Sequence, residues 1–191
     1  MPSSQGFDPS SVHERLRSWL AAQLPDAENV EVSNLDAPSA TGHSSETVLF
    51  DVSWTEAGSP HHDSLVLRTA PSGHTVFPTY DLVRQFETMR LVAQHSDVAV
   101  PNALWVEADP TVLGGEFFVM ERVDGQVPPD VLPYNFGSWV TEASDDERAR
   151  LQRSAIGVLA DLHAIPDASV TFELLAAPGD DRSALRAHVD A

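Results

Sequence analysis

The sequence contains no cysteine and no lysine, because all 11 of its basic residues are arginine. The lack of cysteine excludes disulfide bonds, thiolate nucleophiles and thiolate metal sites, and it suits a reducing compartment. The lack of lysine excludes a Walker-type phosphate loop and Schiff-base chemistry. Any contact with a phosphate group must therefore come from arginine, from backbone amides or from a metal ion.

Positive charge and long apolar runs are also scarce. The formal net charge of −18 would repel nucleic acid and anionic lipid, so neither is expected as a partner. No apolar run is long enough to span a bilayer, and the first eight residues lack the basic start and apolar centre of a signal peptide. We therefore expect a cytoplasmic protein, and its 191 residues with 42% hydrophobic content can form a core.

Apolar residues recur at helical spacing near the start of the chain. Ser10 or Ser11 can cap a helix that runs to about Leu24. One face of this helix is apolar, which predicts that it docks on the rest of the fold through four residues, Val12, Leu16, Trp19 and Leu20.

Alternating apolar and polar residues predict strands at residues 30–35 and 48–54, and further strands are expected at 65–69, 103–107 and 116–122. Residues 56–63 are polar and predict a long turn before the third strand. Turns at Asp109–Pro110 and Gly114–Gly115 are expected to join the last two strands.

Two further helices are expected. A helix over residues 81–95 is predicted to pack on the sheet through an apolar stripe of Leu82, Phe86, Met89 and Ala93. Ser144 followed by Glu147 forms a capping box, which predicts a second helix ending at His163, before Pro166.

The order of these elements resembles the aminoglycoside phosphotransferase family, which has a protein-kinase-like fold, and its branch related to kinase-like domains of acyl-CoA dehydrogenase proteins. The resemblance is carried by TGHSSETVLFDVSW, SLVLRTAPSG, WVEADPTVLGGEFFVMERVDGQVPPD, PYNFGSW and VLADLHAIP. It implies an α+β fold: a protein-kinase-like N-lobe with an antiparallel five-stranded sheet plus helix, followed by an incomplete helical C-lobe. The expected parts are an N-terminal helix (1–29), the N-lobe (30–123), a linker (124–143) and the start of the C-lobe (144–191).

A glycine-containing loop lies between the first two predicted strands. Gly42 lets backbone amides approach a phosphate without a side chain in the way, and serine hydroxyls could add donors. Taken locally, the same loop could be a hairpin turn that uses glycine for a positive φ. The resemblance implies phosphate contacts from Gly42, His43, Ser44 and Ser45, although Ser45 stands where relatives often carry asparagine.

Arg68 stands where kinase-like proteins usually present a lysine to the α and β phosphates. Its guanidinium can make a bidentate phosphate contact, or it could be an edge-strand arginine in solvent. The resemblance implies that a glutamate on the following helix holds this cation, and Glu87 is the obvious carboxylate. Gln85 lies nearer the predicted apolar stripe, so the choice between the two stays open.

The segment Met120–Glu121–Arg122–Val123 resembles the hinge between the two lobes. There we expect the Glu121 carbonyl and the Val123 amide to meet the adenine edge, with Met120 beside them. A buried strand followed by a turn would explain the same residues, because backbone groups leave little trace in a sequence.

Neither a metal site nor catalytic residues are predicted. Adjacent His61 and His62 on an extended chain would point opposite ways, which disfavours joint ligation. The family's His-Gly-Asp catalytic loop, its asparagine and its magnesium-binding aspartate do not occur after His163. We therefore expect negligible phosphoryl transfer by this chain alone.

The resulting prediction is the N-terminal portion of an ATP-dependent small-molecule phosphotransferase. The resemblance implies ATP or GTP with Mg²⁺ as cofactor and a small-molecule acceptor that the sequence does not identify. A homo-oligomer or a missing C-lobe would fit as partner. The alternative is a non-catalytic nucleotide-binding or protein-interaction module, so the sequence leaves open whether the chain is an enzyme.

Overall fold

A computed structural model describes residues 9–33, 35–36, 46–70, 80–128 and 136–176 of the chain. The chain divides into two compact units. The sheet unit comprises residues 1–90 and 101–122, and the helical unit comprises residues 91–100 and 123–191.

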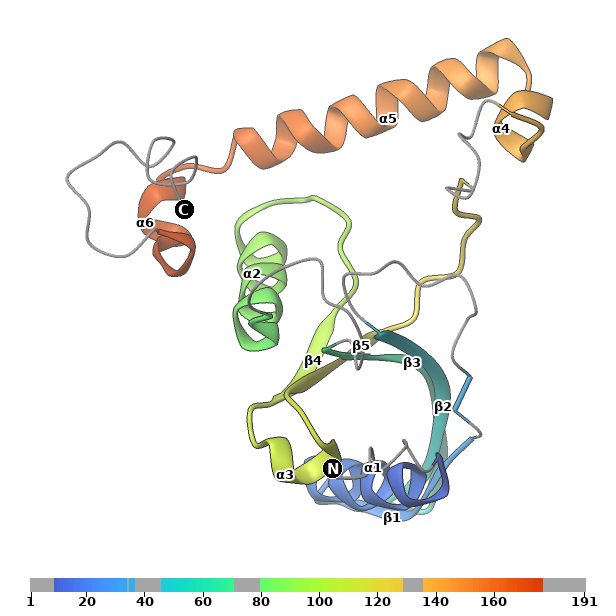
Figure 1. Ribbon diagram of the computed structural model, residues 1–191, viewed down its shortest axis with the longest axis vertical. Coiled ribbons are helices and arrows are strands. Elements are labelled where there is room, and N and C mark those ends of the chain that lie inside the picture. The colour runs from blue at the N-terminus through green and yellow to red at the C-terminus, as the bar shows by residue number, and fades with distance from the viewer. Residues whose placement is uncertain (1–8, 34, 37–45, 71–79, 129–135, 177–191) are drawn as a thin grey trace, which may run out of the picture. The chain divides into compact units, whose positions relative to one another are not determined.

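The sheet unit is built on five antiparallel strands in the order β1-β2-β3-β5-β4 (Figure 1). Their bounds are β1 Ala27–Val32, β2 Glu46–Glu56, β3 Ser59–Thr69, β4 Ala103–Glu107 and β5 Phe117–Glu121. The predicted five-stranded antiparallel sheet is therefore confirmed. Strand β3 lies at its centre, because β2 pairs with one of its edges and β5 with the other.

The turn between β2 and β3 is much shorter than the predicted segment 56–63. Glu56 pairs with Ser59, so only Ala57 and Gly58 form the turn, both with positive φ, at 47° and 79°. Two successive positive φ values suit the tight hairpin turns whose twist matches that of paired strands. Residues 59–63 belong to β3 because their pairing with β2 continues up to the turn. Their polar composition gave no sign of this pairing.

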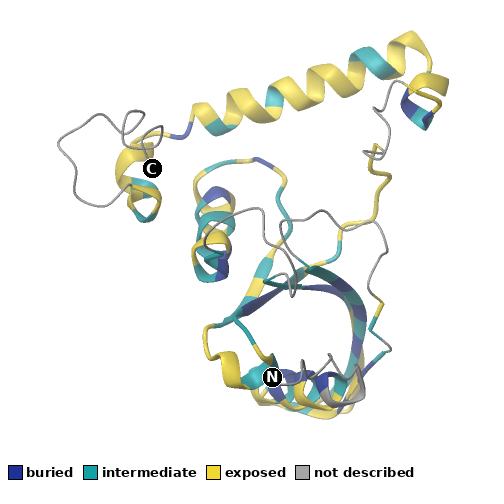
Figure 2. Ribbon diagram, in the orientation of Figure 1, coloured by how far each residue is buried: buried dark blue, intermediate teal, exposed yellow. Residues whose placement is uncertain are grey.

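Helix α1 (Pro9–Gln23) covers one face of the sheet, which we call the α1 face. The predicted docking residues are all buried, with Leu16 and Leu20 fully inaccessible. The helix begins at Pro9, so Ser10 and Ser11 lie in its first turn, where proline is also favourable. Figure 2 shows the buried strands beside it, whose apolar side chains complete the core: Val30, Val32, Val48, Phe50, Val52, Leu65, Leu67, Phe117 and Val119.

Helix α2 (Leu82–His95) packs on the opposite face, which we call the α2 face. Leu82 and Phe86 form a buried cluster with Phe118 of β5, and the two phenylalanine rings meet edge to face with centroids 6.1 Å apart. The predicted stripe is correct at these two helix positions and at Met89, which packs against the same cluster. It is wrong at Ala93, which is exposed, whereas Val92 is buried.

The connection between β4 and β5 contains a short helix, α3 (Pro110–Leu113), in place of the two predicted turns. The Asp109 carboxylate caps it by accepting a bond from the Thr111 backbone amide, and this bond lowers the pKa of Asp109. Gly114 ends the helix at φ 101°. The residues predicted as turns are therefore the two caps of one helical turn.

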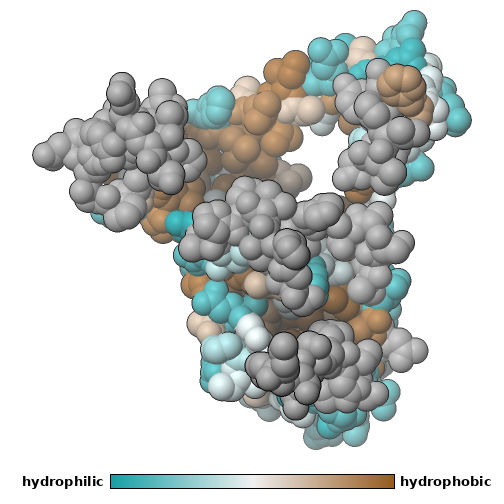
Figure 3. All heavy atoms as spheres, viewed as in Figure 1, coloured by the Kyte–Doolittle hydropathy of each residue, from teal (hydrophilic) through white to brown (hydrophobic). Residues whose placement is uncertain are grey.

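The helical unit contains α4 (Trp139–Glu142), α5 (Asp145–His163), α6 (Ala168–Thr171) and a 3₁₀ turn at Glu173–Leu175. The predicted capping box of α5 is confirmed, since Ser144 and Glu147 bond reciprocally. Apolar side chains gather along α5 (Figure 3), including the exposed Ile156 and Leu159. No helix among the described residues is long and apolar enough to cross a membrane.

Candidate functional site

The predicted phosphate loop lies outside the described residues. Gly42, His43, Ser44 and Ser45 all fall in the segment 37–45, so their part in a site stays a prediction. The other predicted residues are described: Arg68, Glu87, Met120, Glu121 and Val123.

Arg68 lies near the end of the central strand β3 and faces α2. Its neighbour Leu67 belongs to the core on the α1 face, and successive side chains of a strand alternate, so Arg68 takes the α2 face. In register it lies opposite Phe118 of β5, the aromatic residue on which α2 packs. The edge-strand interpretation is wrong, because β3 has partners on both sides.

The surroundings of Arg68 also affect its charge. The side chain is half-buried, and burial lowers the pKa of its guanidinium because a charged group is less stable away from water. Even a lowered arginine pKa leaves the group protonated at neutral pH. The strand therefore presents a partly desolvated cation, for which a bound anion would be favourable.

Gln85 was predicted to be the more buried of the two candidate partners on α2, but Glu87 is the more buried one. Glu87 is half-buried and forms an ion pair with Arg90 on the same helix at 3.2 Å, whereas Gln85 is exposed. Gln85 therefore does not lie nearer the buried stripe. An ion pair between Glu87 and Arg68 stays a prediction.

The predicted hinge begins on the α2 face at the end of β5. Met120 packs against the cluster of Leu82, Phe86 and Phe118. The Glu121 backbone amide donates to the Asn102 carbonyl at 2.9 Å, and the Asn102 side-chain amide donates to the Glu121 carboxylate at 2.8 Å.

The chain passes from the sheet unit to the helical unit between Arg122 and Val123. Val123 is 69% exposed, so its side chain contributes little to packing. The predicted contact of its backbone amide with adenine stays a prediction.

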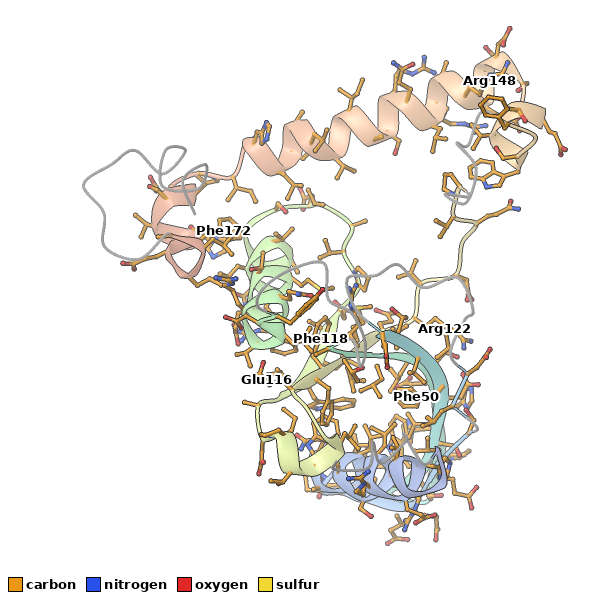
Figure 4. The ribbon with its side chains drawn as sticks, viewed as in Figure 1. Phe50, Glu116, Phe118, Arg122, Arg148 and Phe172 are labelled. Carbon is orange, nitrogen blue, oxygen red and sulfur yellow. The ribbon has the colours of Figure 1, made fainter. Side chains whose placement is uncertain are left out.

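A polar network that the sequence did not indicate joins β2 and β3 to Arg122, the hinge residue directly after β5, which Figure 4 labels. The Ser64 hydroxyl donates to the Asp51 carboxylate at 2.7 Å and accepts from the Arg122 guanidinium at 2.9 Å. The same guanidinium lies 3.4 Å from the Asp51 carboxylate. We call Asp51, Ser64 and Arg122 the hinge network.

The hinge network is fastened to the backbone on both sides. The Arg122 backbone amide donates to the Ser64 carbonyl at 3.0 Å, which extends the β3–β5 ladder one residue past the end of β5. The Asp51 amide donates to the Ser33 hydroxyl, and the Ser33 amide donates to the Asp51 carbonyl, both at 2.8 Å. Arg122 and Asp51 are therefore each held by backbone hydrogen bonds as well as by their side chains.

The only sequence signal for this network was a polar residue on the same face of two neighbouring strands. Asp51 occupies a polar position in the alternating pattern of β2, and Ser64 lies directly opposite it on β3. Their shared partner Arg122 lies 58 residues beyond Ser64, which no local pattern could reveal.

Within the described part of the chain, no group of three or more histidine, cysteine or acidic residues could hold a metal ion. The His61 ring stacks on its cross-strand neighbour Trp54, with centroids 5.2 Å apart and planes 15° apart. This stacking gives His61 a packing role in the hairpin.

The sequence matches a known family over most of its length. Residues 40–190 match the profile of the Phosphotransferase enzyme family. The chain belongs to this family. The match includes β2 to β5 with Arg68 and the hinge network, so both lie within the part of the chain that the family shares.

Individual relatives of this phosphotransferase-family chain agree with the resemblance. The "Probable acyl-CoA dehydrogenase IBR3" of Arabidopsis thaliana is 29% identical over 98 residues, which cover 51% of this chain and 11% of that protein. The crystal structure of a candidate aminoglycoside phosphotransferase from Ralstonia eutropha matches with a TM-score of 0.50 and 24% identity, over 83% of this chain and 39% of that one. The structural match shows a shared fold, and the chain spans less than half of either relative.

Proposed function

We propose that the sheet unit of this phosphotransferase-family chain binds the nucleotide phosphoryl donor on its α2 face. The observation that carries the proposal is Arg68, a partly desolvated cation on the central strand, at the place where the family presents a basic residue to phosphates. A guanidinium binds phosphate oxygens through paired hydrogen bonds, which suits this role in a chain without lysine.

Two further groups complete the proposed nucleotide site. The loop residues Gly42 to Ser45 would bind phosphates through backbone amides and hydroxyls, and the Glu121 carbonyl with the Val123 amide would bind the base. Backbone contacts to the base do not distinguish the nucleotides strongly, so ATP and GTP both fit. Met120 would lie beside the base as part of the α2-face cluster.

Magnesium would enter this site with the nucleotide. Mg²⁺ bound to a nucleotide is held mainly by phosphate oxygens and water, with one or two protein carboxylates. We propose none of the described residues as a ligand, because none of them forms an acidic cluster. Within this site the ion would neutralise phosphate charge.

The phosphoryl acceptor is proposed to be a small molecule with a hydroxyl group, as the family resemblance implies. The catalytic motif that would activate such a hydroxyl does not occur in the 191 residues. We therefore propose that this chain alone binds nucleotide without transferring phosphate, and that a C-lobe partner would supply the chemistry.

Nucleotide titration of an Arg68→Ala variant tests the proposal. Charge-assisted hydrogen bonds contribute roughly 1.5–3 kcal/mol, and about 1.4 kcal/mol is tenfold in affinity, so binding of ATP with Mg²⁺ should weaken about 10- to 100-fold. Arg17→Ala removes the same charge from α1 on the opposite face, where Arg17 pairs with Glu14. Calorimetry on this control should give the wild-type affinity within about twofold. Equal affinities for all three chains would contradict the proposed role of Arg68.

A protein-interaction module is the second candidate, and the exposed surface of α5 favours it. Ile156 and Leu159 are each 57% exposed, and α5 has no buried residue in the described structure. Exposed apolar clusters of this kind occur at interaction sites. A homo-oligomer would then appear as a concentration-dependent mass in solution, whether or not nucleotide is bound.

A further inference from the structure

We infer that the hinge network of Asp51, Ser64 and Arg122 positions the backbone that receives the adenine base. The inference rests on the proposed nucleotide site and assigns Asp51 as a positioning residue that acts through Arg122. Adenine affinity would then depend on a carboxylate of β2, which is distant from the hinge in the sequence.

The network and Arg68 share one face of one strand. Ser64, Val66 and Arg68 alternate with the core residues Leu65 and Leu67, so Ser64 and Arg68 both take the α2 face. Four residues of strand separate them by about 13 Å, at roughly 3.3 Å per residue. The phosphate-binding cation and the hinge network therefore mark two ends of the same face.

The bonds of Arg122 restrict the hinge from the β3 side. Its amide is held by the Ser64 carbonyl at 3.0 Å, and its guanidinium is held by Ser64 at 2.9 Å and Asp51 at 3.4 Å. One residue attached through both its backbone and its side chain has little rotational freedom left. Without Asp51, the guanidinium would keep a single neutral partner in this network.

Asn102 restricts the hinge from the β4 side. It holds Glu121 by a backbone bond of 2.9 Å and a side-chain bond of 2.8 Å. The two hinge residues that end the sheet unit, Glu121 and Arg122, are thus bonded to opposite neighbours. Such preorganisation raises affinity because the ordering cost does not fall on the binding step.

The burial of the network makes it more than a surface ion pair. The side chains of Arg122 and Asp51 are 28% and 37% exposed, so solvent screens their attraction less than that of the exposed pairs on α1 and α2. A polar group in this position also costs desolvation compared with an apolar residue. A gain in orientation at the hinge would offset that cost.

The test compares ligands with and without the base on an Asp51→Ala variant. Binding of ATP with Mg²⁺ should weaken about 5- to 20-fold, whereas binding of inorganic tripolyphosphate with Mg²⁺ should stay within about twofold. Hydrogen exchange at the Glu121 and Arg122 amides of the ligand-free variant should speed up about tenfold or more. Asp63→Ala, which removes an exposed carboxylate from β3, is the matched control and should leave all three quantities unchanged.

Two companion variants make the comparison robust. Asp51→Asn keeps an oxygen that can accept from Ser64 and loses only the charge, so it should fold if Asp51→Ala does not and show a smaller effect of the same kind. Combining Asp51→Ala with Arg122→Gln should cost little more than either change alone, because both break one network.

Each outcome bears on the inference. Equal losses for ATP and tripolyphosphate would overturn it, because a general loss of structure affects both ligands. Unchanged ATP affinity in the Asp51 variants would overturn it and leave the proposed function intact, since the wild-type chain would still bind. Failure of the folded wild-type chain to bind ATP would overturn the proposed function and the inference together.

Discussion

The α2 face of the sheet unit carries two arginines with different surroundings. Arg68 lies on the central strand in a setting that lowers its pKa through burial, whereas Arg122 is held by Ser64 and Asp51. Burial of the Arg68 guanidinium favours an anion beside it, and the bonds of Arg122 suit a structural contact. This difference separates the proposed phosphate contact from the proposed positioning role.

The burial of Phe117 on the α1 face predicts how strongly this residue stabilises the sheet unit. Phe117 is fully buried and meets Trp19 edge to face with centroids 4.8 Å apart. Phe117→Ala should lower the free energy of unfolding of the sheet unit by roughly 3–5 kcal/mol, because it leaves a cavity in the core. Denaturant unfolding followed by tryptophan fluorescence measures this change.

A phenylalanine outside the core provides the control for that prediction. Phe136 is 65% exposed, so Phe136→Ala should change the free energy of unfolding by less than about 0.5 kcal/mol. Similar losses in both variants would mean that the packing of α1 on the sheet does not dominate the stability of this unit.

Single residues were predictable where their role follows from position in the chain. The place of Arg68 near the end of a strand was predictable because its segment is recognisable, whereas its phosphate contact stays a prediction. Asp51 was not, because its partners lie 13 residues away on β3 and at the far end of β5. The exposure of Gln85 was also missed, since small errors in helical phase exchange neighbouring residues between faces.

At the scale of elements, α5 was predictable because its start signal is local. Ser144 accepts from the Glu147 backbone amide while the Glu147 carboxylate accepts from the Ser144 amide and hydroxyl. By contrast, the extent of β3 depended on pairing with β2, and the α3 turn depended on caps that resemble ordinary turn residues. These two misjudged segments are both local, and their residues are polar or turn-forming types that also occur in irregular loops.

The capping box of α5 gives a pH prediction. The bonds from Ser144 lower the pKa of Glu147 below its ordinary value of 4.5, so the ionised form stabilises the helix. This contribution is fully present above pH 4.5 and is lost as the pH falls through the lowered pKa. Hydrogen exchange at the first turn of α5 should therefore show protection that declines in that acidic range.

Glu147→Gln is the matched variant for the capping box. Its neutral amide can still accept bonds from Ser144, so the helix should form, but the acid-dependent loss of protection should disappear. The same pH dependence in Glu147→Gln as in the wild-type chain would show that another group is responsible, such as the neighbouring Asp145 or Asp146.

At the scale of the whole molecule, the chain combines a family-typical sheet unit with a helical unit whose long helix is exposed. The five-stranded antiparallel sheet was predictable from the order of strands and helix, and the structure confirms it. The acceptor was not predictable, because the chain spans 39% of the structural relative.

Backbone-amide NMR of the folded chain during titration with ATP and Mg²⁺ is the direct test of nucleotide binding by the sheet unit. If the nucleotide binds on the α2 face, we expect saturable shifts, with one common dissociation constant, at Arg68, Glu121 and Arg122, and negligible shifts at Leu16 and Leu20 of α1. Absence of saturable shifts at the first three residues, or larger shifts along α1, would contradict it.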